Sequence, residues 1–373
     1  MTTARSPILT THTGSLARPA SLRDMLAARA KKEPLDEALF EQECRGAVAL
    51  VVKRQCDVGL DIINDGEQSK TGFAQYVHER LSGFEGEPVR RVTSLEARQF
   101  PGAPTGSIWQ TPCRAPLSWK NFAAVERDVA ILKDATKGLP QTVFMASVSP
   151  GSFTNNNPNK YYPDRISYLN AVADVMRKEY EAVAAAGFIL QLDCPDLAQR
   201  SYNFPEMPVA EWRSIVTENI DALNRAIRNI PKDKVRVHVC WGANEGPHNY
   251  DTPLSDIIDL LFGLKVSAIS VVGANGRHEH EWRVWQGVKL PAGLKIITGV
   301  VDSTTNIIEH PRVVADRLVR MGRILGPDNI IAGVDCGFGV SGSVAPKVDP
   351  EVAWEKLRAL VEGTAIAREE LQA

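Results

Sequence analysis

Short apolar runs separated by longer stretches of helical periodicity are the feature that most constrains the fold of this 373-residue sequence. Runs rich in β-branched residues that alternate with helical segments predict βαβ units and a parallel sheet. Eight such runs occur, at residues 8–11, 62–64, 143–148, 188–192, 235–239, 268–272, 295–301 and 330–334. Eight parallel strands predict an α/β fold, a (β/α)8 TIM barrel.

Three of the segments between these runs carry clear helix signals. In residues 166–186, apolar side chains recur every three or four positions and Gly187 supplies a stop. Residues 208–230 end at Pro231, and residues 311–325 open with a proline and close at Gly326. Each segment precedes a predicted strand, as the barrel requires.

A typical barrel needs about 250 residues, so roughly 120 remain for additions. We expect an N-terminal helical excursion at residues 17–45. Residues 84–140 are rich in Pro, Gly and Trp and show no helical period. They predict an insertion between strands two and three that lies over one barrel end. No repeat or linker divides the chain, so residues 1–373 are predicted to form a single domain.

Charge and composition narrow the function classes. Lys and Arg number 43 against 45 Asp and Glu, and the net charge of -2 gives no broad attraction to nucleic acid or an anionic membrane. No apolar run approaches the roughly 20 residues of a membrane helix, and the start carries no signal-peptide core. Six thinly spread cysteines favour free thiols or metal ligands over disulfides. We expect a cytoplasmic protein with a small-molecule substrate, and a homo-oligomer stays open.

Polar residues follow most of the predicted strands. In this fold the chemistry lies at the carboxyl ends of the strands. The segments found there are His12 to Ser15, Asp65 to Glu67, Ser147 to Ser149, Asp193 to Asp196, His238 to Cys240, Asp302 to Thr304 and Asp335 to Gly337. The sequence therefore predicts an active site at this end of the barrel.

Three of these residues form a candidate metal site. Residues i and i+2 of a strand point to the same side, so His238 and Cys240 can both face the barrel mouth, about 7 Å apart along the chain. Cys336 ends the strand that closes the barrel. Zinc accepts this mixture of imidazole nitrogen and thiolate sulfur, and three protein ligands with an open position are typical of a catalytic site. The alternative is a core histidine next to a buried structural cysteine.

The motifs together resemble those of the cobalamin-independent methionine synthase family, in particular its short, single-barrel members. The matching segments are His238-Val-Cys240-Trp-Gly, Asp335-Cys336-Gly337-Phe-Gly, Asp65-Gly66-Glu67 and His12-Thr-Gly-Ser15, with Arg277 to Trp282 and Asp302 to Asn306 typical of one subgroup. The resemblance implies Zn2+ bound by His238, Cys240 and Cys336 and a metal-bound thiolate that attacks an alkyl carbon. Epoxyalkane:coenzyme M transferase is a related short-chain activity.

The resemblance also implies roles for the substrate-binding residues. Glu67 and Asp193 match carboxylates that hold the ammonium group of homocysteine. Ser15 and its neighbours, His12 among them, match the loop that holds the amino-acid carboxylate. Asp302 is the candidate for handling the proton balance of the reaction. The predicted partners are a small-molecule thiol and an alkyl donor that supplies a methyl or hydroxyalkyl group.

Two positions depart from the family pattern. A glutamate that acts as a further zinc ligand falls on Val272, and a histidine that donates a proton falls on Thr304. These losses favour an activated electrophile such as an epoxide over a methylated folate. Two alternatives stay open: a metal-free decarboxylase of the uroporphyrinogen decarboxylase type, and a catalytically inactive barrel that binds a small ligand.

The run His278-Glu279-His280-Glu281 could supply a replacement ligand. A polar run at a helix start is more typical of solvated surface, and we treat it as a candidate contact just outside the metal ligands. Cys194, next to Asp193, is expected to be a buried structural cysteine.

Overall fold

The computed structural model describes residues 8–103, 109–339 and 341–372. Its central sheet has seven parallel strands in the order β1-β4-β5-β6-β7-β8-β9. These strands are β1 (Ile62–Ile63), β4 (Thr142–Val148), β5 (Ile189–Asp193), β6 (Val235–His238), β7 (Ala268–Val271), β8 (Lys295–Val301) and β9 (Ile330–Val334). A separate antiparallel pair is formed by β2 (Val89–Arg90) and β3 (Trp109–Gln110).

The segment around Thr10 takes the eighth place in the sheet, between the two edge strands. The Thr11 N–H donates to the Ala332 carbonyl of β9 at 2.9 Å, and the Ile62 N–H of β1 donates to the Thr10 carbonyl at 3.0 Å. Regular pairing is limited to a bridge between Thr10 and Ala332. The first predicted run is therefore less regular than expected, but it joins both edges of the curled sheet, and the predicted barrel is confirmed.

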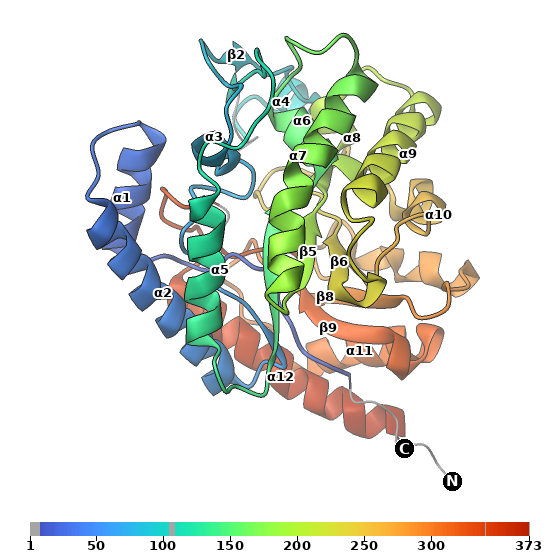
Figure 1. Ribbon diagram of the computed structural model, residues 1–373. Helices are drawn as coiled ribbons and strands as arrows, with labels where there is room; N and C mark the ends of the chain where they lie inside the picture. The colour runs from blue at the N-terminus through green and yellow to red at the C-terminus, as the bar shows by residue number, and fades with distance from the viewer. Residues whose placement is uncertain (1–7, 104–108, 340, 373) are drawn as a thin grey trace.

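Helices surround this sheet (Figure 1). The longer ones are α1 (Ala20–Ala30), α2 (Glu37–Val58), α5 (Ala123–Ala135), α7 (Arg165–Ala185), α9 (Val209–Ala226), α11 (Pro311–Leu325) and α12 (Pro350–Gln372). The shorter α-helices are α3 (Val77–Arg80), α4 (Leu95–Gln99), α6 (Pro150–Asn156), α8 (Arg200–Asn203) and α10 (Ile258–Leu261). The 3-10 segments are η1 (Pro195–Leu197), η2 (Lys232–Lys234), η3 (Leu254–Asp256), η4 (Glu279–Gly287) and η5 (Pro327–Asn329).

Local sequence explains where the main helices begin and end. The Asp164 carboxylate accepts the Ser167 N–H at 2.7 Å, which caps α7. Gly59 adopts a φ of 93° directly after α2, a left-handed conformation that favours glycine. Pro311 opens α11, where its missing N–H costs nothing. The predicted helices at 166–186 and 311–325 are confirmed, and the one at 208–230 is shorter than predicted.

The region between β1 and β4 differs in part from the prediction. The expectation that residues 84–140 lack a helix is wrong for α5, which buries Val125, Ile131 and Leu132. α2 also continues past the predicted excursion at 17–45 and packs against α5. Figure 1 shows β2 and α4 near α6 and α8 at one end of the molecule, whereas α5 lies between α2 and α7. That residues 84–140 as a whole form an insertion over one barrel end stays a prediction. The assignment of the whole chain to a single domain stays a prediction.

The inside of the barrel is apolar at one level and polar above it. A small cluster of buried residues consists of Ile62, Phe144, Ala268, Ile297 and Ile331. The guanidinium of Arg236 lies 3.6 Å from the centre of the Phe144 ring and donates to the side chain of Gln191 at 2.9 Å. The apolar layer fills the core, and the polar layer supports the site at the carboxyl ends of the strands.

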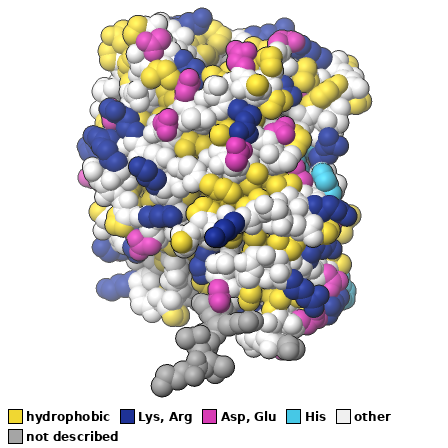
Figure 2. Space-filling model, turned by 90° about the vertical axis from the view of Figure 1, so that its right-hand side faces the viewer, with side chains coloured by type: hydrophobic (Ala, Val, Ile, Leu, Met, Phe, Trp, Pro, Cys, Tyr) yellow, Lys and Arg dark blue, Asp and Glu magenta, His cyan; other side chains and the backbone are white. Residues whose placement is uncertain are grey.

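The outer surface mixes charges of both signs. On the face in Figure 2, basic and acidic side chains are interspersed with apolar ones. Among the helices of the described residues, none combines the length and apolar character needed to cross a membrane.

Candidate active site

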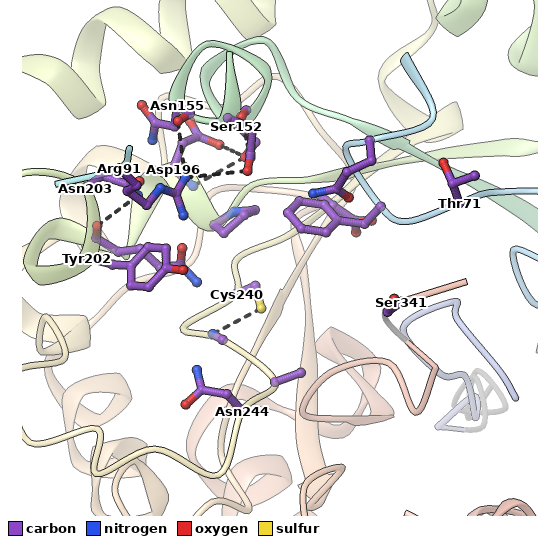
Figure 3. Close-up of a pocket in the computed structure, with 18 of the residues that line it drawn as sticks. Thr71, Arg91, Ser152, Asn155, Asp196, Tyr202, Asn203, Cys240, Asn244 and Ser341 are labelled. Carbon is purple, nitrogen blue, oxygen red and sulfur yellow. Dashed lines mark hydrogen bonds between the residues drawn. The ribbon is translucent and has the colours of Figure 1, made fainter. Parts of the chain in front are cut away.

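A cavity of about 1220 Å3 opens at the carboxyl ends of the strands. Glu67 follows β1, Asp193 and His238 end β5 and β6, and Cys240 and Cys336 lie just beyond β6 and β9, and all five line the cavity. Loops after the strands and the inserted segment complete the wall, and Cys240 lies among these lining residues in Figure 3. The structure thus brings together the ends of four strands that are far apart in the sequence.

Three of these side chains have the arrangement of a metal site. The ligand atoms of His238, Cys240 and Cys336 all lie within 4.8 Å of one another, and the residues are buried. The two sulfur atoms are 3.4 Å apart. Two thiolates on one tetrahedral zinc, with Zn–S bonds of about 2.3 Å, would lie ~3.8 Å apart. The donor set and its spacing therefore fit a zinc ion with little movement of the side chains.

The electrostatics favour a thiolate at Cys240. The hydrogen bond with Cys336 is the main cause that lowers the pKa of the Cys240 thiol well below its usual range, and the same bond raises the pKa of Cys336. The Gly242 N–H also donates to the Cys240 sulfur at 3.3 Å. Burial opposes a charge on His238, yet the nearby Cys240 and the Asp193 carboxylate raise its pKa to about 10. These shifts favour a thiolate at Cys240 and a protonated imidazole at His238, although both side chains are buried.

His238 is held in orientation by two oxygen acceptors. Its Nδ1 lies 3.3 Å from Asp193 Oδ1, and its Nε2 lies 3.3 Å from the backbone carbonyl of Asp335. The Asp335 carboxylate accepts the N–H groups of Gly273 and Asn275 at 2.9 and 2.6 Å and so fixes the loop after β7. Acceptors of this kind orient a histidine that binds a metal.

Glu67 and Asp193 place two carboxylates in the cavity wall. Burial is the main cause that raises the pKa of Glu67 to about 7, and the Asp193 charge adds to it. Within the described residues, Glu67 Oε2 is buried and accepts no hydrogen bond. Gln191 donates to Asp193 Oδ1 at 2.9 Å. A buried carboxylate oxygen without a donor is costly, so this pair has the chemistry to receive a cationic group.

Ser15 lies beside this pair because two glycines allow close packing. A Cβ on Gly14, whose φ is 142°, would come within 2.8 Å of Glu67 Oε1. A Cβ on Gly337, directly after Cys336, would come within 2.0 Å of Ser15 Oγ. Arg18 ties the same loops together through the carbonyls of Glu67 and Gly339, both at 2.5 Å. The predicted Ser15 loop therefore lines the cavity next to the metal cluster.

Four other predicted positions lie outside the wall that the described residues form. His12 is buried, bonds to Gln55 at 2.8 Å, and has a pKa lowered to about 4 by burial. The Asp302 carboxylate accepts the N–H groups of Thr304 and Thr305 in its own turn. Val272 is 8% exposed and lines a separate small cavity of about 20 Å3. Cys194 is fully buried, as expected for a structural cysteine.

Sequence reasoning missed a polar network at the edge of the cavity. His248 and Asp251 line the cavity, and Asp251 contacts His278, which in turn contacts Glu281. The expectation that the run from His278 to Glu281 is solvated surface is wrong for its first and last members, which are 4% and 5% exposed. A histidine and an acid three residues apart, followed at once by Trp282, were the available indication.

The whole arrangement can be compared with known proteins. The family model described as the catalytic domain of cobalamin-independent synthase matches residues 8–348. The chain belongs to this family. Among relatives of the cobalamin-independent synthase family, the methionine synthase of Sulfolobus acidocaldarius is 27% identical over 97% of this chain and 93% of its own. The 2-hydroxypropyl-CoM lyase of Xanthobacter autotrophicus is 24% identical over 91% of this chain and 89% of its own.

A solved structure shows the same fold. The B12-independent methionine synthase from Shewanella sp. W3-18-1, in complex with selenomethionine, superposes with a TM-score of 0.75. The two sequences are 22% identical, and the match covers 98% of this chain and 99% of the other. Relatives in this family are named as enzymes, a synthase and a lyase, which supports a transferase or lyase here.

Proposed function

We propose that this protein is a zinc-dependent enzyme that transfers a methyl or hydroxyalkyl group between a small thiol and an alkyl donor. The observation that carries the proposal is the buried cluster of His238, Cys240 and Cys336, with ligand atoms within 4.8 Å, in the wall of a large cavity. These residues would hold the zinc ion. Bound zinc lowers the pKa of a thiol enough to leave the nucleophilic thiolate at neutral pH.

The other groups of the cavity indicate which thiol it takes. Glu67 and Asp193 place two carboxylates beside the cluster, and Glu67 Oε2 lacks a donor among the described residues. A substrate ammonium group would donate a hydrogen bond to this oxygen, and the Ser15 loop would hold the carboxylate of the same substrate. An amino-acid thiol such as homocysteine therefore fits the site, whereas the sulfonate of coenzyme M would meet two carboxylates of like charge.

The two alternative functions lack comparable support. A metal-free decarboxylase has no use for His238, Cys240 and Cys336 together, and the family match runs through all three. A barrel that only binds a ligand would not need a cysteine whose pKa is lowered by its neighbouring thiol. The unpaired state of all six cysteines suits a reducing compartment, and we place the protein in the cytoplasm.

Metal analysis and thiol titration test the proposal. The purified protein should contain one zinc per chain. A cobalt-substituted sample titrated with homocysteine, 2-mercaptoethanol and coenzyme M should develop sulfur-to-metal charge-transfer bands, most readily with homocysteine. Glu67→Gln should reduce the preference for homocysteine over 2-mercaptoethanol without loss of metal. A protein that contains no zinc and shows no thiol-dependent band would overturn the proposal.

A further inference from the structure

Two histidines and two carboxylates form a continuous network along one wall of the cavity. His248 Nδ1 lies 2.7 Å from Asp251 Oδ2, and His278 Nε2 lies 2.9 Å from the same oxygen. His278 Nδ1 lies 2.9 Å from Glu281 Oε2. His248 and Asp251 belong to the loop that follows β6, and His278 and Glu281 belong to the start of η4. The network thus connects the loop after β6, which lines the cavity, to η4.

The bonding partners fix the protonation of both rings. His248 Nε2 lies 3.0 Å from the Asn244 carbonyl, so both of its nitrogens face oxygen acceptors. His278 lies between two carboxylates in the same way. A neutral imidazole has a single N–H, and its second nitrogen would meet an oxygen lone pair. Both rings are therefore satisfied as imidazolium ions, and their two charges balance those of Asp251 and Glu281.

The network leads from the interior to the cavity. The side chains of His278 and Glu281 are 4% and 6% exposed, whereas that of His248 is 10% exposed and lines the cavity. His248 has a φ of 54°, in the left-handed region that a residue with a side chain seldom adopts. Asn244, its other partner, also lines the cavity and lies on the same loop as Cys240 in Figure 3. Strained backbone of this kind is concentrated at functional sites.

Alkyl transfer needs a proton donor when the leaving atom is nitrogen or oxygen. The position that carries the donor histidine in the resembling family is Thr304, and Thr304 and Asp302 lie outside the cavity wall formed by the described residues. His248 is an imidazolium in that wall, on the loop that begins beside Cys240. We propose that His248 is the acid that protonates the leaving atom of the alkyl donor, an inference that rests on the proposed thiol alkylation.

The step balances in bonds and protons. The thiolate sulfur forms a bond to the alkyl carbon, and the bond between that carbon and the leaving oxygen or nitrogen breaks with its electron pair on the leaving atom. The proton on His248 Nε2, now shared with the Asn244 carbonyl, moves to that atom. His248 keeps its Nδ1 proton, which is hydrogen-bonded to Asp251, and takes up a new Nε2 proton from water. The thiol has given one proton to water, so no net proton is gained or lost.

Asp251, His278 and Glu281 act through His248 and are positioning residues. Burial disfavours the charged form of His248, but Asp251 outweighs it and raises the pKa of His248 above its ordinary value. The other charged groups near this loop are His278, Glu281, Arg277, whose side chain bonds the Asn249 carbonyl, and Glu96, which accepts the Tyr250 N–H. Glu245, on the loop itself, pairs with Lys347 at 2.7 Å. We expect the rate of a reaction that needs the acid to fall as pH rises through the pKa of His248.

Two alkyl donors distinguish the contribution of the acid to the rate from that of the other groups in the site. Propylene oxide opens to an alkoxide that must be protonated, whereas methyl iodide releases iodide, which needs no proton. With zinc-loaded protein and homocysteine, His248→Gly should slow thioether formation from propylene oxide by about 10²- to 10⁴-fold, the usual contribution of a general acid. The same variant should react with methyl iodide at the rate of the unchanged protein.

His248→Gly also suits the backbone, because glycine adopts positive φ without strain. It leaves a gap that added imidazole can fill, and imidazole should restore the propylene oxide reaction. His280→Gln is the matched control, since His280 is an exposed histidine on η4, two residues after His278 of the network. Equal rates with propylene oxide in the glycine variant and the unchanged protein, or equal slowing with both donors, would overturn the role of His248.

A measurement on the metal-free protein gives a second, independent test. Nitrogen NMR of the histidine rings should show His248 doubly protonated at neutral pH and singly protonated in Asp251→Asn. A neutral His248 in the unchanged protein would overturn the inference. Failure of methyl iodide to alkylate homocysteine above the uncatalysed rate would instead overturn the proposed thiol alkylation, so the two failures are distinguishable.

Discussion

Replacing His278 with glutamine should destabilise the protein at neutral pH and reduce the dependence of its stability on pH. Burial lowers the pKa of His278, but hydrogen bonds with Asp251 and Glu281 outweigh burial and raise it from 6.5 to about 9. At about 1.4 kcal/mol per pH unit, this difference corresponds to roughly 3 kcal/mol of stability from the charged form. Glutamine fills similar space but leaves the two carboxylates without the cation between them.

The direction of the pH effect follows from the raised pKa. His278 binds its proton more tightly in the folded protein than in the unfolded chain. Its contribution is complete below about pH 6.5 and is lost as pH rises through about 9. The free energy of unfolding should therefore decrease by roughly 3 kcal/mol across this range on account of His278. His248, whose pKa is also raised, acts in the same direction.

Urea unfolding followed by circular dichroism measures this effect. The transitions should be recorded at about pH 6 and about pH 9.5 for the unchanged protein, His278→Gln and the control His280→Gln. The unchanged protein and the control should lose stability together between these pH values. The His278→Gln variant should start lower and lose much less. A variant whose stability falls as steeply as that of the control would refute the buried imidazolium.

Further predictions concern the metal and the substrate. Cys240→Ser and Cys336→Ser should each lose most of the zinc while the barrel stays folded, because the ligands end strands that pack without the metal; elemental analysis and circular dichroism check this. Replacing Glu67 or Asp193 with alanine should lower kcat/KM at least tenfold for an amino-acid thiol and retain zinc; wild-type kinetics in both variants would contradict the assignment. With methyl-tetrahydrofolate and homocysteine, little or no methionine should form, because Val272 supplies no carboxylate and leaves the thiolate less electron-rich; robust synthesis measured by mass spectrometry would contradict the weight given to Val272.

The barrel and the metal cluster were predictable because each depends on a simple repeat. Side chains that follow parallel strands must meet at one end of the sheet, so His238, Cys240 and Cys336 could be grouped without knowledge of the loops. Alternation of apolar runs located the strands in the same way. The first strand was predicted longer than it is, because a few hydrogen bonds around Thr10 suffice to join both edges.

The helix α5 and the polar network were not predictable by this reasoning. α5 follows a stretch rich in Pro and Gly, and that composition obscured its short apolar stripe. Asp251 and His278 are 27 positions apart. Their contact depends on how two loops fold back on each other, and the periodicity of the sequence does not predict such a contact. Polar runs are usually solvated, so the burial of His278 and Glu281 became visible only once their partners were known.

The charges around the cavity connect these features. With zinc bound, His238 as a neutral imidazole and two thiolates would balance the divalent ion, whereas a glutamate at Val272 would add one further negative charge. A less anionic environment leaves a thiolate less electron-rich, which suits an electrophile that is already activated. Such a donor still needs protonation of its leaving oxygen or nitrogen. The chain lacks a histidine at Thr304 and carries an imidazolium at His248, on the loop that starts beside Cys240. The acid and the metal ligand Cys240 would then belong to the same loop, and the leaving atom of the donor would have to replace the Asn244 carbonyl, now 3.0 Å from His248 Nε2, as the acceptor of the proton.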